Sequence, residues 1–179
     1  KTIDKAQTIT LALPAKNEII PTTGEVRLLV SGGTIGAIKD SLFFLMQYPY
    51  GCSEQTTSTM ISNIVLSKFL KQSGINVFGV KQETINANVS KALARLYTYQ
   101  SDRGGWSLWG GNENVEPYLT SYVLTGMQQA REAGFTIDTN VLEKGRKYLR
   151  GQLDNGSIGQ VDVQAQVLAT LLSLSDTNL

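Results

Sequence analysis

The chain has 179 residues, of which 41% are hydrophobic and 17% are charged, and its formal net charge is +1. That length supports one sizeable hydrophobic core, and the balance is that of an ordinary globular domain. The lysines and arginines form no basic block, which argues against a nucleic-acid partner. No apolar run approaches the roughly 20 residues that span a bilayer, so we expect no membrane insertion in this segment.

The histidine and cysteine content limits the kinds of catalytic and metal site that the chain can form. The chain contains no histidine and a single cysteine, Cys52. Ser-His-Asp and Cys-His catalysis are therefore excluded, as are most zinc sites. One cysteine cannot form an internal disulfide or a thiolate metal cluster. We expect neither a metal site nor a cofactor.

The N-terminal part has the pattern of extended chain. Two short runs of aliphatic and β-branched residues, 9–14 and 25–31, flank a turn signal at 21–24 and predict two β-strands. The glycine pair at 32–33 then marks a boundary. We therefore divide the chain into a β-strand segment, 1–33, and a helical domain, 34–179.

From residue 34 onward the hydrophobic pattern has the helical period. Helices are predicted over 35–47, over about 52–72 and 84–99, from Pro117 to Gly134, from a cap at Asp138 to about 153, and around 163–172. In the helices predicted between 52 and 134, the residues expected to face the core are Ile61, Ile64, Val65, Phe69, Val89, Leu93, Leu96, Tyr97, Leu119, Tyr122, Val123, Met127 and Ala130. The last two helices carry Leu142, Leu149, Leu153, Val163, Val167, Leu168, Leu171 and Leu172.

An internal repeat links the helix ends. Gln100, Gly104 and Trp106 align at a constant offset with Gln152, Gly156 and Ile158. In each copy we expect the glutamine to bond backbone groups, the glycine to adopt positive φ, and the last residue to fill the gap between hairpins. Such repeats predict a solenoid or a closed ring of hairpins.

The stretch QSDRGGW (100–106) resembles the Q-x-x-x-G-x-W pattern of terpene cyclases, whose fold is an α/α toroid. The cyclase chemistry does not follow, because the chain has no acidic proton-donor motif. Prenyltransferase β-subunits share the architecture but need a histidine among their zinc ligands. The resemblance therefore implies the toroid scaffold and not these activities.

The single cysteine allows several roles: an apolar core residue, a nucleophile, a metal ligand, or one end of an unusual covalent bond. Cys52 and Gln55 are three positions apart, so on the first turn of a helix they lie on one face. Gly51 removes a side chain that would crowd the sulfur. The positive end of a helix favours a thiolate, and a thiolate held beside a carboxamide can displace ammonia to form a thioester.

These residues belong to a longer pattern. YPYGCSEQTTS (48–58) contains G-C-x-E-Q, and GGWSLWGG (104–111) and residues 116–135 follow it. Together they resemble the thioester-containing domain of the alpha-2-macroglobulin family, in its bacterial form, which is related to the complement thioester domain. The resemblance implies a mainly α fold, an α/α toroid of helical hairpins. It also implies that residues 1–33 come from a neighbouring CUB-type domain, and that the toroid is truncated, with an apolar edge exposed.

The resemblance also implies a function. In this family a protease cleaves a bait region, and one of its lysine amines attacks the acyl carbon of Gln55 and releases Cys52. The domain is consumed once and is not an enzyme. Its partners are target proteases and the other domains of the same polypeptide, in the periplasm, the cell envelope or outside the cell.

The resemblance makes Tyr48, Pro49, Tyr50, Gly51 and Glu54 the motif residues around the expected thioester, and it implies that Tyr48 and Tyr50 shield the bond from water. Trp106 and Trp109 are expected to serve packing. Because the chain has no histidine to take over the acyl group, we expect transfer to amines rather than hydroxyls.

Two alternatives to covalent capture stay open. One is a structural helical-hairpin module of a cell-envelope protein, without a functional thioester. The other is an enzyme of the toroid class with Cys52 as nucleophile, which is the weaker because no general base pairs with Cys52 in the sequence.

Overall fold

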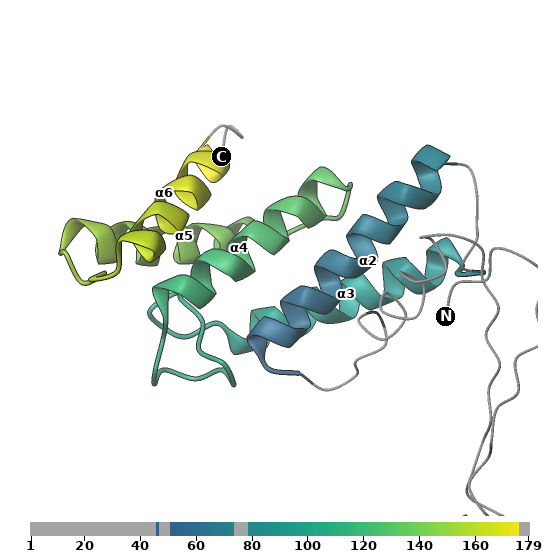
Figure 1. The fold of residues 1–179 in the computed structure, drawn as a ribbon. Coiled ribbons are helices and arrows are strands. Elements are labelled where there is room, and N and C mark those ends of the chain that lie inside the picture. Colours follow the sequence, from purple (N-terminus) through teal and green to yellow (C-terminus); the bar gives the residue numbers. More distant parts are fainter. Residues whose placement is uncertain (1–45, 47–50, 74–78, 176–179) are drawn as a thin grey trace, which may run out of the picture.

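The described part of the chain, Met46, residues 51–73 and residues 79–175 of a computed structural model, is helical. It contains no β-strand beyond one isolated bridge between Gln100 and Trp106. The five helices labelled in Figure 1 are α2 (Ser53–Ser73), α3 (Gln82–Tyr99), α4 (Pro117–Glu132), α5 (Thr139–Asp154) and α6 (Val161–Ser175).

The helices form two layers. In Figure 1, α2, α4 and α6 lie side by side and run in the same direction, while α3 and α5 lie behind them and run the opposite way. Each front helix therefore makes an antiparallel hairpin with the back helix that follows or precedes it. This is the arrangement expected for part of an α/α toroid. It also brings the starts of α2 and α4 to the same side of the molecule.

Local signals set the helix ends. Pro117 is the first residue of α4, where a missing N–H is tolerated. Gly134, with φ of 94°, follows the end of that helix and donates its N–H to the carbonyl of Arg131. The Asp138 carboxylate accepts the N–H of Asn140 at 2.8 Å and caps α5. The predicted starts of these two helices are confirmed. α5 ends close to the predicted residue, and α4 ends at Glu132, shortly before the predicted Gly134.

The core lies between the two layers. The predicted inward positions of α3 are confirmed for Val89, Leu93 and Leu96, which are buried, and Tyr97 is half-buried. In α4, Tyr122 is half-buried and the other predicted residues are buried. The buried apolar side chains are Met46, Cys52, Met60, Ile64, Leu66, Val80, Ile85, Val89, Ala92, Leu93, Leu96, Trp106, Leu119, Val123, Leu124, Met127, Ala130, Ile137, Leu142, Leu149, Ile158, Val167, Leu171 and Leu174.

The predicted inward face of α2 is partly wrong. Ile64 is buried, but Val65 is 50% exposed and Phe69 36% exposed. The buried face of α2 mixes small polar and apolar side chains, among them Thr57, Met60 and Leu66. α4 approaches this face closely: a Cβ added at Gly126 would lie 2.8 Å from Thr57 Cγ2. Thr57 can be buried there because its hydroxyl donates to the Ser53 carbonyl at 2.7 Å.

In α6 the prediction holds for one side of the helix only. Val167 and Leu171 are buried, and Val163 is half-buried. Leu168 and Leu172 are 50% and 66% exposed. They lie at an edge of the described helices, as expected for an array of hairpins that is not closed.

The first copy of the repeat has the predicted contacts. The Gln100 side-chain amide donates to the carbonyls of Gly104 at 2.8 Å and Val141 at 2.9 Å, which joins the end of α3 to α5. Trp106 is fully buried, and its indole N–H donates to the Leu96 carbonyl at 2.7 Å. Side-chain hydrogen bonds from Gln100 and Trp106 therefore hold both ends of the turn at 100–106.

The second copy repeats the turn. Gly104 and Gly156 have φ of 93° and 68°, and each donates its N–H to the carbonyl three residues earlier, at 2.9 and 3.1 Å. Ile158 is buried, as Trp106 is in the first copy. The glycine turn and the buried residue after it are therefore repeated, but Gln152 lies inside α5 rather than just after a helix, as Gln100 does.

Several predictions lie outside the described residues. These are the strands at 9–14 and 25–31, the boundary at 33, and the helix at 35–47 apart from Met46, which is helical and buried. In the described part, none of the helices is both long and apolar enough to cross a bilayer.

Candidate functional site

Cys52 occupies the position immediately before α2. Its carbonyl accepts the N–H of Thr56 at 2.9 Å, the first helical hydrogen bond, so Cys52 is the N-cap residue. The helix begins one residue later than predicted for this reason. Cys52 is a free cysteine and only 7% of its surface is exposed.

Gln55 folds back toward the residue that caps the helix. The backbone N–H of Cys52 donates to Gln55 Oε1 at 3.2 Å. This is half of a capping box, in which a third-position glutamine satisfies the N–H of the cap residue. The structure therefore brings together the two residues that the sequence pairs, with the carboxamide oxygen held at the Cys52 main chain. The rest of Gln55 is exposed to solvent.

Gly51 leaves room for this fold-back. A Cβ built on Gly51 would lie 2.7 Å from Gln55 Cβ and 3.3 Å from Gln55 Oε1. The first of these distances is shorter than real carbon contacts allow. The sequence predicted that Gly51 spares the sulfur from crowding; what the structure shows is that Gly51 spares the Gln55 side chain.

A loop distant in the sequence supports the start of α2. The N–H of Ser53 donates to the carbonyl of Leu108 at 2.7 Å, and the Ser53 hydroxyl donates to the carbonyl of Ser107 at 2.6 Å. The Ser107 hydroxyl in turn donates to the Gly110 carbonyl at 2.7 Å. Sequence reasoning missed this contact; the only signal was that GGWSLWGG follows the Cys-Gln motif in the resembling family.

The two tryptophans of that loop differ. Trp106 is fully buried and serves packing, as predicted. Trp109 is 71% exposed and Leu108 is 47% exposed, so the packing role predicted for Trp109 is wrong within the described residues. An apolar surface therefore stands beside the residues that hold the start of α2.

The remaining predicted site residues divide into two groups. Glu54 is exposed in the first turn of α2. Tyr48, Pro49 and Tyr50 lie outside the described residues. Across the ranges that the structure describes, no group of three or more acidic or thiol side chains could hold a metal ion.

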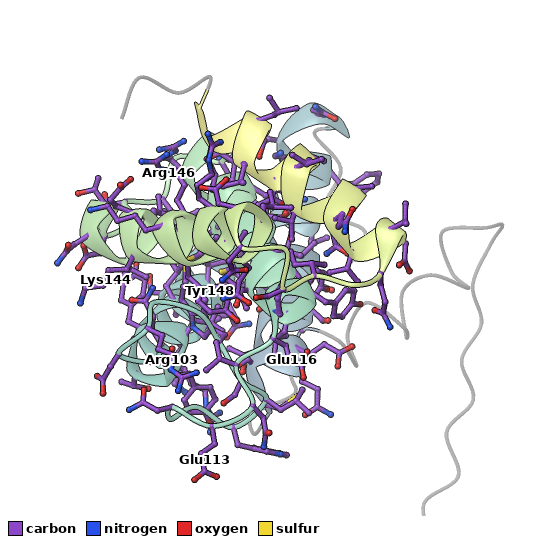
Figure 2. The ribbon with its side chains drawn as sticks, turned by 90° about the vertical axis from the view of Figure 1, so that its left-hand side faces the viewer. Arg103, Glu113, Glu116, Lys144, Arg146 and Tyr148 are labelled. Carbon is purple, nitrogen blue, oxygen red and sulfur yellow. The ribbon has the colours of Figure 1, made fainter. Side chains whose placement is uncertain are left out.

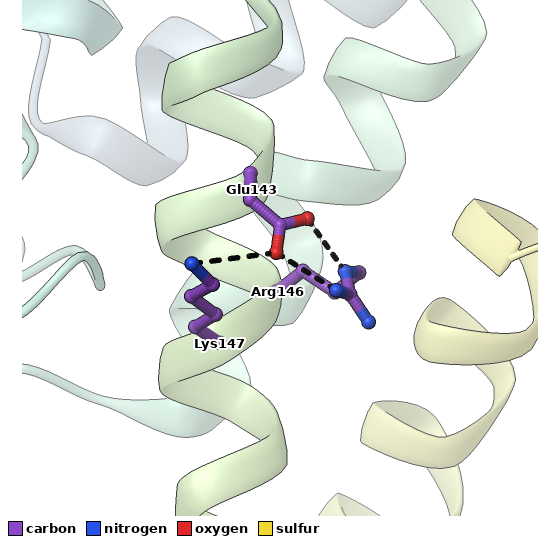
Figure 3. Close-up of polar contacts among 3 residues, drawn as sticks. All are labelled: Glu143, Arg146 and Lys147. Atoms are coloured by element: carbon purple, nitrogen blue, oxygen red, sulfur yellow. Dashed lines mark hydrogen bonds and ion pairs between the residues drawn. The ribbon is translucent and has the colours of Figure 1, made fainter. Parts of the chain in front are cut away.

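The charged side chains of α5 form a group of ion pairs on the helix surface. On α5, the Glu143 carboxylate pairs with the Arg146 guanidinium, whose Nε and Nη2 each lie 2.8 Å from a carboxylate oxygen (Figure 3). Lys147 Nζ lies 3.8 Å from Glu143 Oε1. The Arg146 hydrogen bond lowers the pKa of Glu143. These side chains are solvated and only one turn apart, which is typical of helix-surface ion pairs.

Tyr148 joins α5 to a loop that lies distant in the sequence. Figure 2 shows it on the side of α5 that faces the loop carrying Arg103 and Glu116. Its hydroxyl donates to the carbonyl of Val115 at 2.9 Å. Burial, and then the charge of Glu116, raise the pKa of Tyr148. The phenol therefore ties α5 to the loop in its neutral form.

The fold and the site together define a class: a two-layer helical-hairpin domain with a Cys-x-x-Gln pair folded together at the start of a front-layer helix. The family described as the A-macroglobulin TED domain matches residues 26–169. The chain belongs to this family, and the resemblance seen in its sequence is confirmed.

Curated relatives agree with the family match. The chain is 33% identical over 142 residues to an alpha-2-macroglobulin of Escherichia coli K12, and the aligned residues make up 78% of this chain and 8% of that relative. It is 32% identical over 139 residues to one from Xylella fastidiosa Temecula1, with the same coverage of 78% and 8%. The chain thus spans less than a tenth of the length of these relatives.

Solved structures show the same likeness. The native conformation of E. coli alpha-2-macroglobulin, from cryo-electron microscopy, superposes with a TM-score of 0.59 at 30% identity, covering 76% of this chain and 9% of that one. A crystal structure of Salmonella alpha-2-macroglobulin reacted with methylamine gives 0.57 at 30% identity, covering 75% and 9%.

Proposed function

We propose that this chain is the thioester domain of a bacterial-type alpha-macroglobulin protease inhibitor, in which Cys52 Sγ and Gln55 Cδ form an internal thioester. One observation carries the proposal. In a chain of the TED family, the Gln55 carboxamide is folded back onto the main chain of Cys52, with 3.2 Å between the Cys52 nitrogen and Gln55 Oε1. The contact keeps the residue that carries the nucleophile beside the carbonyl it would attack, and such proximity raises the effective concentration of the reacting groups.

The chemistry balances without a cofactor. The Cys52 thiolate attacks Gln55 Cδ, the bond from Cδ to Nε2 breaks, and the nitrogen leaves as ammonia after taking up the proton that the thiol lost. A lysine amine of an attacking protease later adds to the same carbon. The carbon–sulfur bond then breaks, the Cys52 thiolate leaves, and an amide joins the protease to residue 55. The domain reacts once and is not an enzyme.

The bond must be kept from water before it is triggered. Leu108 and Trp109 expose apolar surface from the loop that binds Ser53. We propose that another domain of the same polypeptide covers this surface together with Tyr48 and Tyr50, and withdraws when a protease cuts the bait region.

The proposal extends to the surroundings of the domain. Residues 1–33 are assigned to a neighbouring CUB-type domain. Leu168 and Leu172, exposed on α6, would be covered by further hairpins of the toroid. A protease trap acts outside the cytoplasm, so the periplasm, the cell envelope or the exterior is the proposed location.

The test is methylamine incorporation into the full-length protein. The Salmonella relative was solved after reaction with methylamine, and we expect this chain to take up one methylamine at residue 55. The variant Cys52→Ala should take up none, while Ser62→Ala, one of the same helix's half-buried serines, should react like the unchanged protein. Incorporation that persists in Cys52→Ala would sink the assignment. No incorporation in the unchanged protein would favour a purely structural module, with Cys52 as a core residue.

A further inference from the structure

We infer that the backbone N–H of Cys52 polarises the Gln55 carbonyl in the thioester reactions, and that Gly51 is the positioning residue that makes this contact possible. The inference rests on the proposed function. It concerns how the Cys-Gln pair reacts, rather than whether the pair forms a bond.

The contact involves the reacting carbonyl itself. Gln55 Oε1, which accepts the Cys52 N–H at 3.2 Å, is bonded to Cδ, the carbon that the thiolate attacks. When the thiolate adds, negative charge develops on Oε1, and a donor already aimed at that oxygen stabilises the charge without having to reorganise. The oxygen stays on the acyl carbon when ammonia leaves. The same N–H can therefore serve when an amine opens the thioester.

The main-chain position of the donor has a chemical advantage. The N–H belongs to the residue that supplies the nucleophile, so the sulfur and the donor approach Cδ and Oε1 from one short segment. The segment is held in place, because Cys52 is buried and the next residue, Ser53, donates two hydrogen bonds to the loop at 107–108. The donor takes no part in the covalent steps and keeps its proton throughout.

Gly51 controls whether Oε1 can reach the donor. The clash that a side chain would cause is with Gln55 Cβ, at 2.7 Å. Cβ is fixed to the helix backbone, so it cannot swing away as the tip of a flexible side chain could. An alanine at 51 must therefore shift the first turn of α2 or turn the Gln55 side chain outward, and either change separates Oε1 from the Cys52 N–H.

Three glycine-to-alanine variants of the full-length protein separate positioning from general damage. Gly51→Ala should slow thioester closure, followed as ammonia loss by intact mass after refolding, by about tenfold or more. Gly151→Ala adds a methyl group to open space and should close normally. Gly145→Ala places its Cβ 2.9 Å from Leu124 Cδ2, so it should lower the thermal midpoint while its folded fraction still closes at the normal rate.

A backbone substitution tests the donor directly. Replacing Cys52 with its α-hydroxy analogue turns the N–H into an ester oxygen and leaves every side chain in place. We expect closure to slow by about tenfold to a hundredfold. A role limited to helix capping would change local stability, seen as faster amide exchange in α2, without changing the rate of closure in folded protein.

The outcomes distinguish this inference from the proposed function. If the unchanged protein never loses ammonia, both are wrong. If it does, and the α-hydroxy analogue and Gly51→Ala close at the normal rate, the thioester stands and the inference is overturned. The inference is also overturned if Gly145→Ala slows closure in its folded fraction as much as Gly51→Ala does.

Discussion

Replacing Ser53 with alanine should loosen the attachment of the 107–108 loop to the start of α2. Ser53 is fully buried, and its hydroxyl donates to the Ser107 carbonyl at 2.6 Å. The variant removes this donor and leaves a buried carbonyl without it, at a cost of about 1–3 kcal/mol. The bond from the Ser53 N–H to the Leu108 carbonyl remains, so the loop stays attached and the loss should not exceed this range.

Hydrogen exchange in the full-length protein measures the effect where it occurs. A local loss of about 1–3 kcal/mol corresponds to exchange that is about 5-fold to 150-fold faster in peptides covering 51–60 and 104–116. The control is Ser62→Ala, whose hydroxyl bonds within its own helix to the Ser58 carbonyl; it should change exchange by less than about threefold. Equal exchange in the two variants would refute the view that the Ser53 side chain holds the loop.

Three further results are expected. Gly104→Ala should lower the thermal midpoint more than Gly111→Ala. Both glycines have positive φ, but only at Gly104 would the added Cβ meet a backbone carbonyl of α5. Equal losses would mean that backbone strain alone, and not this clash, sets the cost. Burial raises the pKa of Tyr148, so the stability that its neutral phenol contributes is fully present below about pH 10 and is lost as pH rises through the higher pKa of the folded state. Tyr148→Phe should therefore remove this alkaline decline in the urea midpoint. A decline that persists in the variant would contradict the assignment of the decline to Tyr148. Activated protein should transfer the acyl group of residue 55 to methylamine faster as pH rises from about 6 to about 9, because an amine must be unprotonated to attack. Transfer to glycerol should be weak, because a neutral hydroxyl needs a base to take its proton. Ester formation that matches amide formation would show that another residue supplies this base.

The sequence predicted the elements whose signals are local. Pro117, Gly134 and Asp138 set helix ends by backbone chemistry that needs no distant partner, and each acts at the expected place. The repeat predicted the paired turns because the glycine at each turn is required by its positive φ. The Cys52–Gln55 proximity was predicted from two positions on one helical face, but the structure brings the pair together differently, through the backbone N–H of the cap residue.

The sequence could not predict features that depend on which helix packs on which. Val65 was taken as inward because it is apolar, whereas the close approach of α4 at Gly126 is met by Thr57 and Met60, which are buried while Val65 is exposed. The Ser53–Ser107 bond joins residues 54 positions apart, and nothing local marks either of them. Trp109 shows the same limit: both tryptophans of the glycine-rich loop were expected to pack in the core, but only Trp106 is buried there.

The central claim is the covalent bond between Cys52 and Gln55. Its most direct test is the intact mass of the native full-length protein, measured without reductant or nucleophile and again after exposure to methylamine. We expect a protein lighter than its sequence by one ammonia molecule, which gains one methylamine when treated and gives Cys52 as a newly accessible thiol. A protein with the full mass of its sequence, folded and unchanged by methylamine, would show that the bond does not form.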